Sequence, residues 1–192
     1  MISAIVLAAG YSRRMNDQNK LIKKFKSKHL INHILDTLIK SKINKIIIVL
    51  GFQNSKVKKI IVKNNKISFV YNKNYKSGMA SSIKSGLKRI SKISIGFLIV
   101  QADMPLVSRK IINSLYYALK NSDKEIVAPI YKKKMGNPIG FKNSMVKKFN
   151  KIKGDSGAKK MIKRNEKKLA LINVNSKSIL KDFNTQRDFS IN

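Results

Sequence analysis

The sequence begins with a short apolar run, residues 2–8, which ends at the small residues Ala9 and Gly10. The run is rich in β-branched residues and does not alternate regularly with polar positions, which is typical of a parallel strand buried on both faces. Such strands occur in open α/β sheets, and these sheets bind ligands beyond the carboxyl ends of their strands. The residues that follow the run are therefore the first candidates for a binding site.

The loop after this run combines small and basic residues. Ala8, Ala9 and Gly10 lack bulky side chains, so the backbone there can approach a ligand closely. The hydroxyl and the positive charges that suit a polyphosphate come from Ser12, Arg13, Arg14 and Lys20. Neither Gly-x-x-x-x-Gly-Lys-Ser/Thr nor Gly-x-Gly-x-x-Gly is present. The pattern favours a phosphate-binding loop of another kind, and an ordinary basic loop after a buried strand is the alternative.

Apolar runs and helical periodicity alternate along the rest of the chain. The predicted strands are 45–50, 67–71, 95–100 and 125–130, and the predicted helices cover 30–39, 57–61, 78–90 and 108–120. This alternation favours an α/β fold with a mostly parallel sheet and right-handed crossovers. We expect a single-domain, Rossmann-like three-layer sandwich over residues 1–192, because no linker, repeat or low-complexity segment interrupts the sequence.

The composition limits the class of protein. With 192 residues, 43% of them hydrophobic, the chain can bury a full core. It has no cysteine, which excludes disulfides and thiolate metal sites. No apolar run approaches the length of a membrane span, and no cleavage-site pattern follows the first strand. We therefore expect no membrane association and a cytoplasmic location.

The net charge of +33 raises the question of nucleic-acid binding. The 42 Lys and Arg residues are mostly lysines, spread along the chain among asparagines and isoleucines. The sequence has no confined arginine-rich patch, no interleaved aromatic platform and no zinc knuckle. Solvated lysine faces explain the charge better than a nucleic-acid function, although the positive field would attract anionic ligands.

One carboxylate is expected at the tip of a strand. Asp103 directly follows the predicted strand 95–100, and Pro105 forces a turn two residues later. A carboxylate in this position suits Mg²⁺, a hard cation that bridges phosphates during nucleotidyl transfer. The alternative is that Asp103 only caps the turn.

Two further segments place small, polar residues at the start of a helix. Residues 77–86 contain Gly78, Met79 and Ser82 where free backbone N–H groups are expected, so they either line a ligand site or form a plain helix start. Asp155 either caps the helix that follows it or binds a substrate. His29 and His33 are spaced for one helix face, but no third ligand is evident, so we expect surface residues and not a zinc pair.

The first loop resembles the signature loop of the MobA-like nucleotidyltransferases, most closely the molybdenum cofactor cytidylyltransferases. The resemblance rests on Leu7-Ala-Ala-Gly-Tyr-Ser-Arg-Arg-Met15 and Asn19-Lys20-Leu21. It implies that the loop wraps a nucleoside triphosphate and that Arg14 and Lys20 hold its phosphates. It also implies a set of nucleotide-binding residues, namely Leu7, Ala8, Ala9, Gly10, Ser12, Gly78, Met79 and Ser82. The family usually has glycine where this chain has Asn16.

Later motifs follow the order of the same family. The segment from Gly78 resembles the one that lines the base pocket in the cytidylyltransferase branch, and Asp103 matches the aspartate of the Gly-Asp-Met-Pro metal motif. Asn137 replaces the histidine of a Gly-His-Pro strand on the acceptor side, which puts that residue's role in doubt. Asp155 matches the aspartate of a Gly-Asp-x-Gly-Ala motif. Asn184 replaces an aspartate near the C-terminus that is a possible second metal ligand.

The resemblance implies transfer of CMP from CTP to a molybdopterin-type molybdenum cofactor, with release of pyrophosphate. Mg²⁺ would be the cofactor, held by Asp103 and Asn184, and Arg14, Lys20 and Asp103 would be the catalytic residues. A molybdoenzyme would be a possible recipient of the product. The alternatives are a sugar-1-phosphate or other MobA-like nucleotidyltransferase that uses GTP or UTP, and a basic nucleic-acid-binding protein.

Overall fold

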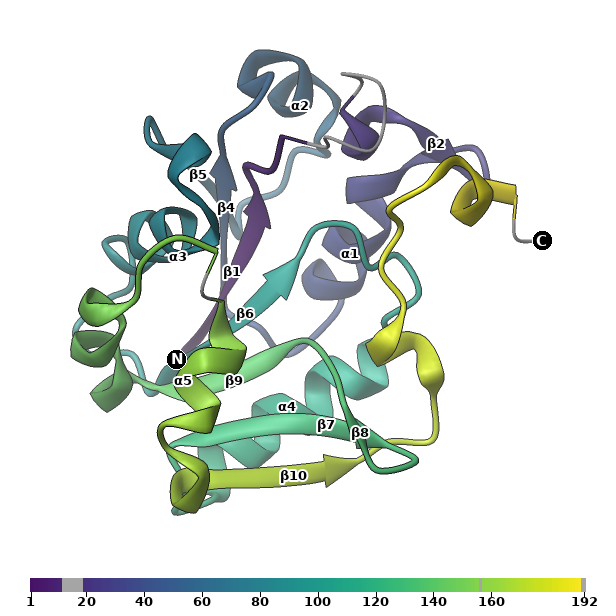
Figure 1. Ribbon diagram of the computed structural model, residues 1–192. Helices are drawn as coiled ribbons and strands as arrows, with labels where there is room; N and C mark the ends of the chain where they lie inside the picture. The colour runs from purple at the N-terminus through teal and green to yellow at the C-terminus, as the bar shows by residue number, and fades with distance from the viewer. Residues whose placement is uncertain (12–18, 156, 191–192) are drawn as a thin grey trace.

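A mixed β-sheet forms the middle layer of the computed structural model, which describes residues 1–11, 19–155 and 157–190 (Figure 1). The order across the sheet is β10-β7-β9-β6-β1-β4-β5, and β8 pairs with β7. Its strands are β1 Ile2–Ala8, β4 Lys45–Leu50, β5 Ile67–Tyr71, β6 Gly96–Gln101, β7 Ile126–Tyr131, β8 Lys134–Met135, β9 Ile139–Lys142 and β10 Leu169–Asn173. A separate small hairpin consists of β2 Lys24–Phe25 and β3 Lys28–His29.

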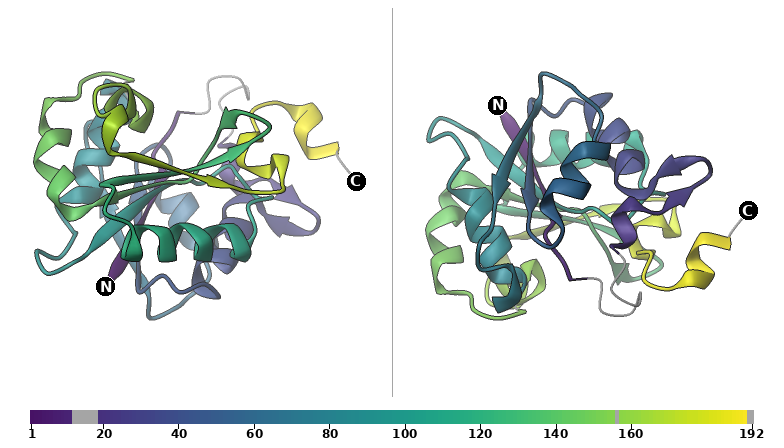
Figure 2. Two further views of the ribbon diagram at one scale, coloured as in Figure 1. Left: turned by 90° about the horizontal axis from the view of Figure 1, so that it is seen from below. Right: turned by 90° about the horizontal axis from the view of Figure 1, so that it is seen from above.

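Helices cover both faces of this sheet (Figure 2). The α-helices are α1 Leu30–Ile39, α2 Asn54–Ile60, α3 Met79–Leu87, α4 Arg109–Asn121 and α5 Ala158–Lys163. The 3₁₀ helices are η2 Lys20–Ile22, η3 Tyr75–Ser77, η4 Asn143–Lys151, η5 Glu166–Lys168, η6 Lys177–Leu180 and η7 Gln186–Ser190. The predicted three-layer α/β sandwich is confirmed. Within the described residues, no helix is long and apolar enough to span a membrane.

Strand β1 separates two hydrophobic cores because alternate side chains of a strand point to opposite faces. Ala4, Val6 and Ala8 pack in the core that α1 and α4 cover. Ile5 and Ala9 pack in the second core, with α3, η4 and α5. Burial on both faces is the reason that β1 reads as a continuous apolar run.

The parallel centre of the sheet determines where a ligand can bind. In register, Val6 of β1 lies between Ile48 of β4 and Val100 of β6. The carboxyl ends of these three strands therefore lie at one edge of the sheet. Gly86 lets α3 lie close to β1, since a Cβ on Gly86 would come within 2.4 Å of the Ile5 side chain. The close packing brings the start of α3 to the same edge.

The predicted, mostly parallel sheet is confirmed, with β9 antiparallel to both β6 and β7 and the short β8 antiparallel to β7. Two other expectations are corrected. The helix expected over 78–90 ends at Leu87, and Lys88 closes it by donating its backbone N–H to the Lys84 carbonyl. His29 and His33 are partly buried, and their ring nitrogens bond to the backbone carbonyls of residues 22 and 25. They are structural residues, not free surface histidines.

Candidate functional site

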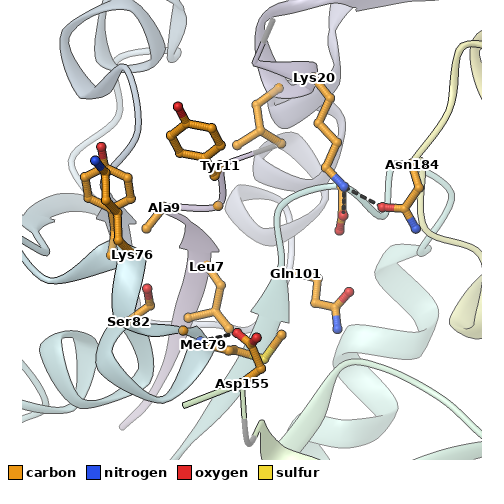
Figure 3. Close-up of a pocket in the computed structure, with 15 residues that line it drawn as sticks. Leu7, Ala9, Tyr11, Lys20, Lys76, Met79, Ser82, Gln101, Asp155 and Asn184 are labelled. Carbon is orange, nitrogen blue, oxygen red and sulfur yellow. Dashed lines mark hydrogen bonds and ion pairs between the residues drawn. The ribbon is translucent and has the colours of Figure 1, made fainter. Parts of the chain in front are cut away.

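A cavity of about 630 Å³ lies at the carboxyl edge of the parallel strands (Figure 3). The ends of β1 and β6, helix η2, the start of α3 and the C-terminal segment form its walls. Its lining residues are Leu7, Ala9, Gly10, Tyr11, Lys20, Leu21, Tyr75, Lys76, Gly78, Met79, Ser82, Gln101, Asp103, Asp155 and Asn184. A volume of this size is within the range of small-molecule and cofactor sites, about 300–1,000 Å³.

Lys20 connects three parts of the chain at one wall of this cavity. Its ammonium donates to Asp103 Oδ2 at 2.5 Å and to Asn184 Oδ1 at 2.7 Å (Figure 3). The side chains of Lys20 and Asp103 are only 16% and 14% exposed, so water screens this ion pair less than a surface pair. The first loop, the tip of β6 and the C-terminal segment therefore meet at one charged cluster.

The arrangement around Asp103 fits a divalent cation. Asp103 Oδ1 is buried and has no hydrogen-bond partner within the described residues, although Oδ2 pairs with Lys20. An unsatisfied buried carboxylate oxygen is costly, and a cation or a donor would satisfy it. The described residues contain no cluster of three or more His, Cys, Asp or Glu side chains. A cation here would thus depend on Asp103, the Asn184 oxygen and the oxygens of a ligand, which is how proteins commonly hold Mg²⁺.

The start of α3 forms the opposite wall. Gly78 has φ +99°, and a Cβ there would lie 2.4 Å from the Gly154 carbonyl carbon, so only glycine fits. Asp155 accepts a hydrogen bond from the Met79 backbone N–H at 3.3 Å. Asp155 therefore caps α3 and lines the cavity, whereas Gly157 precedes its own helix without a side-chain cap. The alternative that Asp155 caps the following helix is therefore wrong, and the alternative that it binds substrate stays a prediction.

Ser82 is held in place by a residue that sequence patterns missed. Asn72, just beyond β5, is buried, and its Nδ2 donates to Ser82 Oγ at 3.0 Å and to Ser81 Oγ at 2.8 Å. Ser82 is only 6% exposed and still lines the cavity. The hydroxyl of Ser82 is thus fixed at the wall, in a position to contact a ligand.

Several other lining residues were assigned no role from the sequence. Tyr11 and Tyr75 provide aromatic surface, and the Tyr11 ring packs against Phe52 with centroids 4.4 Å apart. Lys76 adds a second positive charge to the wall that contains Tyr75. Tyr11 belongs to the first motif, but only the fold could show that residues of the 72–77 loop reach the same cavity.

Most residues that the sequence nominated do meet here. Ten of the described candidates line the cavity, and they are Leu7, Ala9, Gly10, Lys20, Gly78, Met79, Ser82, Asp103, Asp155 and Asn184. Ala8 does not, because its side chain points into the core on the opposite face of β1. Asn137 is also absent from the lining. Ser12 and Arg14 lie outside the described residues, and their roles stay predictions.

Asp188 fixes the segment that carries Asn184. Its Oδ2 accepts the backbone N–H groups of Asn184 and Thr185, both at 2.8 Å, and its Oδ1 accepts a hydrogen bond from the Lys181 ammonium. The Lys181 contact, followed by the two backbone donors, lowers the pKa of the Asp188 carboxyl well below its ordinary value. The carboxylate therefore keeps its charge and its contacts in mildly acidic solution.

We expect the stability contributed by Asp188 to be complete above about pH 5 and to decline as the pH falls below about 4. The folded-state pKa is lower than the unfolded-state pKa, so acid protonates the unfolded chain first and shifts the equilibrium toward it. Urea unfolding should show Asp188→Asn less stable than wild type by about 1–3 kcal/mol at neutral pH. The difference should shrink at pH values near 3, and a difference that does not change with pH would contradict this role.

Comparisons with known proteins agree with this architecture. The bifunctional protein GlmU of Ruthia magnifica subsp. Calyptogena magnifica is 28% identical over 141 residues, which cover 73% of this chain and 29% of that protein. GlmU of Francisella tularensis subsp. novicida is 25% identical over 152 residues, 79% of this chain and 32% of that protein. The chain thus spans about a third of the length of these curated relatives.

Solved structures share the fold over almost the whole chain. A homologue of Mycobacterium tuberculosis Rv0371c from Mycobacterium sp. strain JC1 has a TM-score of 0.86 at 21% identity, covering 98% of this chain and 93% of that chain. Rv0371c in complex with manganese has a TM-score of 0.81 at 20% identity, covering 98% and 96%. The 4-diphosphocytidyl-2C-methyl-D-erythritol synthase of Anaerococcus prevotii has a TM-score of 0.74 at 20% identity, covering 98% and 92%.

The sequence profile of one family decides the assignment. It matches residues 4–169, which include most of β1, the start of α3, Asp103 and the loop with Asp155. The match therefore covers most of the residues that line the cavity. By this match, the chain belongs to the family of the MobA-like NTP transferase domain.

Proposed function

We propose that this protein is a nucleotidyltransferase that transfers CMP from CTP to a molybdopterin-type molybdenum cofactor and releases pyrophosphate. The observation that carries the proposal is the meeting of Lys20 and Asp103 at the wall of a cavity that adjoins the first loop. One side chain offers positive charge for phosphates, and the other offers oxygen for a divalent cation. Family membership supports a nucleoside triphosphate as the donor.

The reaction needs positioning and charge neutralisation more than covalent help from the protein. A phosphate oxygen of the acceptor would attack the α-phosphorus of CTP in line, forming a new P–O bond as the bond to pyrophosphate breaks. Lys20, with Arg14 as a further candidate, would offset the negative charge that accumulates on pyrophosphate. Asp103 and Asn184 would hold Mg²⁺, which supplies Lewis-acid stabilisation of the phosphates when bound. The manganese complex of the similar Rv0371c structure supports a divalent cation.

Three features support cytosine as the base. Ala9 adds a methyl group at the end of β1, and its side chain is only 3% exposed. Ser82 presents a fixed hydroxyl at the same cavity. The similar structure from Anaerococcus prevotii is named as a diphosphocytidyl synthase. A pocket narrowed in this way and built on hydrogen bonds would favour a pyrimidine, since a purine would clash or leave polar groups unpaired.

A pyrophosphate-release screen tests the donor. With molybdopterin cofactor and Mg²⁺, we expect kcat/KM for CTP to exceed that for GTP by about a hundredfold or more, because each unpaired buried polar group costs about 1–3 kcal/mol. Ser82→Ala should reduce the preference. Ser81→Ala is the matched control, since Ser81 also bonds to Asn72 but does not line the cavity.

The same assay separates the rival assignments. Equal turnover of GTP and CTP would reject the cytidylyl assignment and leave nucleotidyl transfer in place. Turnover with sugar 1-phosphates in place of molybdopterin would assign a different acceptor. If a molybdoenzyme receives the product, the cytidylylated cofactor should pass to it directly. Absence of pyrophosphate release with every acceptor would reject the proposed activity.

A further inference from the structure

The side-chain amide of Asn184 is held at both of its ends. Its Nδ2 donates to Asp182 Oδ2 at 2.7 Å, and its Oδ1 accepts from the Lys20 ammonium at 2.7 Å. Its backbone N–H is fixed separately, by the Asp188 carboxylate at 2.8 Å. The side chain and the main chain of Asn184 therefore have different partners.

These partners permit one orientation of the amide. A carboxylate only accepts hydrogen bonds and an ammonium only donates them. Turning the amide by 180° would place its NH₂ group against the Lys20 ammonium and its oxygen against the Asp182 carboxylate, which would lose both hydrogen bonds and create two repulsions. Asp182 and Lys20 thus direct the oxygen of Asn184 toward the cluster with Asp103.

Phe183, the residue between Asp182 and Asn184, anchors this segment. Phe183 is fully buried, and its ring packs against Phe25 and Phe189 with centroids 4.9 and 5.6 Å away. Its backbone N–H donates to the Asp103 carbonyl at 2.9 Å. Because the backbone of this segment is tied to Asp103, just after β6, Asn184 is held at the cavity wall with Asp182 as its hydrogen-bond partner.

We infer that Asp182 is a positioning residue that keeps the Asn184 oxygen directed at the divalent cation of the proposed nucleotidyltransferase. The inference rests on the proposed function, because the divalent cation at this site is part of that proposal. An asparagine needs such a partner because only one of its two terminal atoms can bind a cation, whereas either oxygen of an aspartate can do so. When a cation takes the Asn184 oxygen, the hydrogen bond to Asp182 prevents the amide from presenting its nitrogen.

Binding of Mn²⁺ measures this role without depending on turnover. Electron paramagnetic resonance of free Mn²⁺ gives its dissociation constant for the full chain, alone and with CTP. We expect Asp182→Ala to raise that constant by about tenfold or more, as for other partners that orient metal ligands. Asp182→Asn is the matched control, because it removes the same charge but keeps an oxygen that can accept from Asn184, and it should stay within about threefold of wild type.

Repeating the measurement in the Asn184→Asp protein tests whether the effect depends on the orientation of the amide. With Asn184→Asp, residue 184 has oxygens at both ends, so Asp182→Ala and Asp182→Asn should give the same Mn²⁺ affinity. Thermal unfolding of each variant checks that the fold is retained. The inference is confirmed by two results together. Asp182→Ala and Asp182→Asn should differ in Mn²⁺ affinity when residue 184 is asparagine, and they should have the same affinity when residue 184 is aspartate.

Three results would overturn the inference. Asp182→Ala could bind Mn²⁺ as wild type does, Asp182→Asn could lose as much affinity as Asp182→Ala, or the wild-type protein could bind no Mn²⁺ in this cavity. The proposed transfer reaction fails in a different way, by normal Mn²⁺ binding without pyrophosphate release. Metal affinity and turnover therefore report separately on the two proposals.

Discussion

Asp103→Ala is expected to reduce the rate of nucleotidyl transfer by about a thousandfold, which corresponds to roughly 4 kcal/mol of transition-state stabilisation. The change removes the carboxylate that we propose as the main cation ligand, including the buried oxygen that has no partner within the described residues. The backbone carbonyl of Asp103, which accepts the Phe183 N–H, is unaffected. Steady-state pyrophosphate release with CTP measures the effect.

Asp36→Ala is the control for this variant. Asp36 also forms an ion pair with a lysine, Lys28, but that pair lies on the surface and outside the cavity. We expect its turnover to stay close to wild type. A folded Asp103→Ala protein with near-normal turnover would remove the basis for the proposed cation site.

Lys20→Ala should lower kcat/KM for CTP by two or more decades, about 2.7 kcal/mol or more. The positive charge of Lys20 stabilises the transition state more than the bound substrate, because negative charge moves onto the leaving pyrophosphate in the transition state. We therefore expect kcat to fall more than KM rises. Lys20 also links Asp103 to Asn184, so we expect its loss to lower the melting temperature as well.

Lys23→Ala separates the two effects. Lys23 follows helix η2, and its ammonium also reaches the C-terminal segment, donating to Gln186 Oε1 at 2.7 Å, but it does not line the cavity. We expect its kinetics to match wild type. Unchanged kinetics for Lys20→Ala, measured below its melting temperature, would mean that this lysine has only a structural role. The same test applies to Arg14, whose role stays a prediction from the first loop.

Local sequence was enough for strands β4 and β5. The predicted strand at 45–50 coincides with β4, which is almost entirely buried, and the one at 67–71 coincides with β5, a partly buried edge strand. A continuous apolar run must be removed from water, and in an alternating α/β pattern the sheet is where this happens. Ser108 begins the predicted helix 108–120, and its hydroxyl accepts the Ile111 N–H at 3.4 Å, as is typical of a helix N-cap. Short-range rules determine such features because every participating residue is a close neighbour in the chain.

The edge strand β10 and the direction of β9 were not predicted. Residues 169–172 of β10 are apolar, but the strand is short and only partly buried, and among the described strands it pairs with β7. The direction of β9 depends on how residues 132–138 turn the chain back beside β6, which hydrophobic periodicity does not encode.

By itself the sequence determined the family, the α/β alternation and the loop and carboxylate at the carboxyl ends of β1 and β6. Only the tertiary structure decided that Asn184 reaches Lys20, 164 residues away, that Asp155 caps α3, and that Asn72 fixes Ser82. Each of these contacts joins two different segments of the chain. Their partners are selected by the packing of helices and strands, and packing is a property of the whole chain, not of any local pattern.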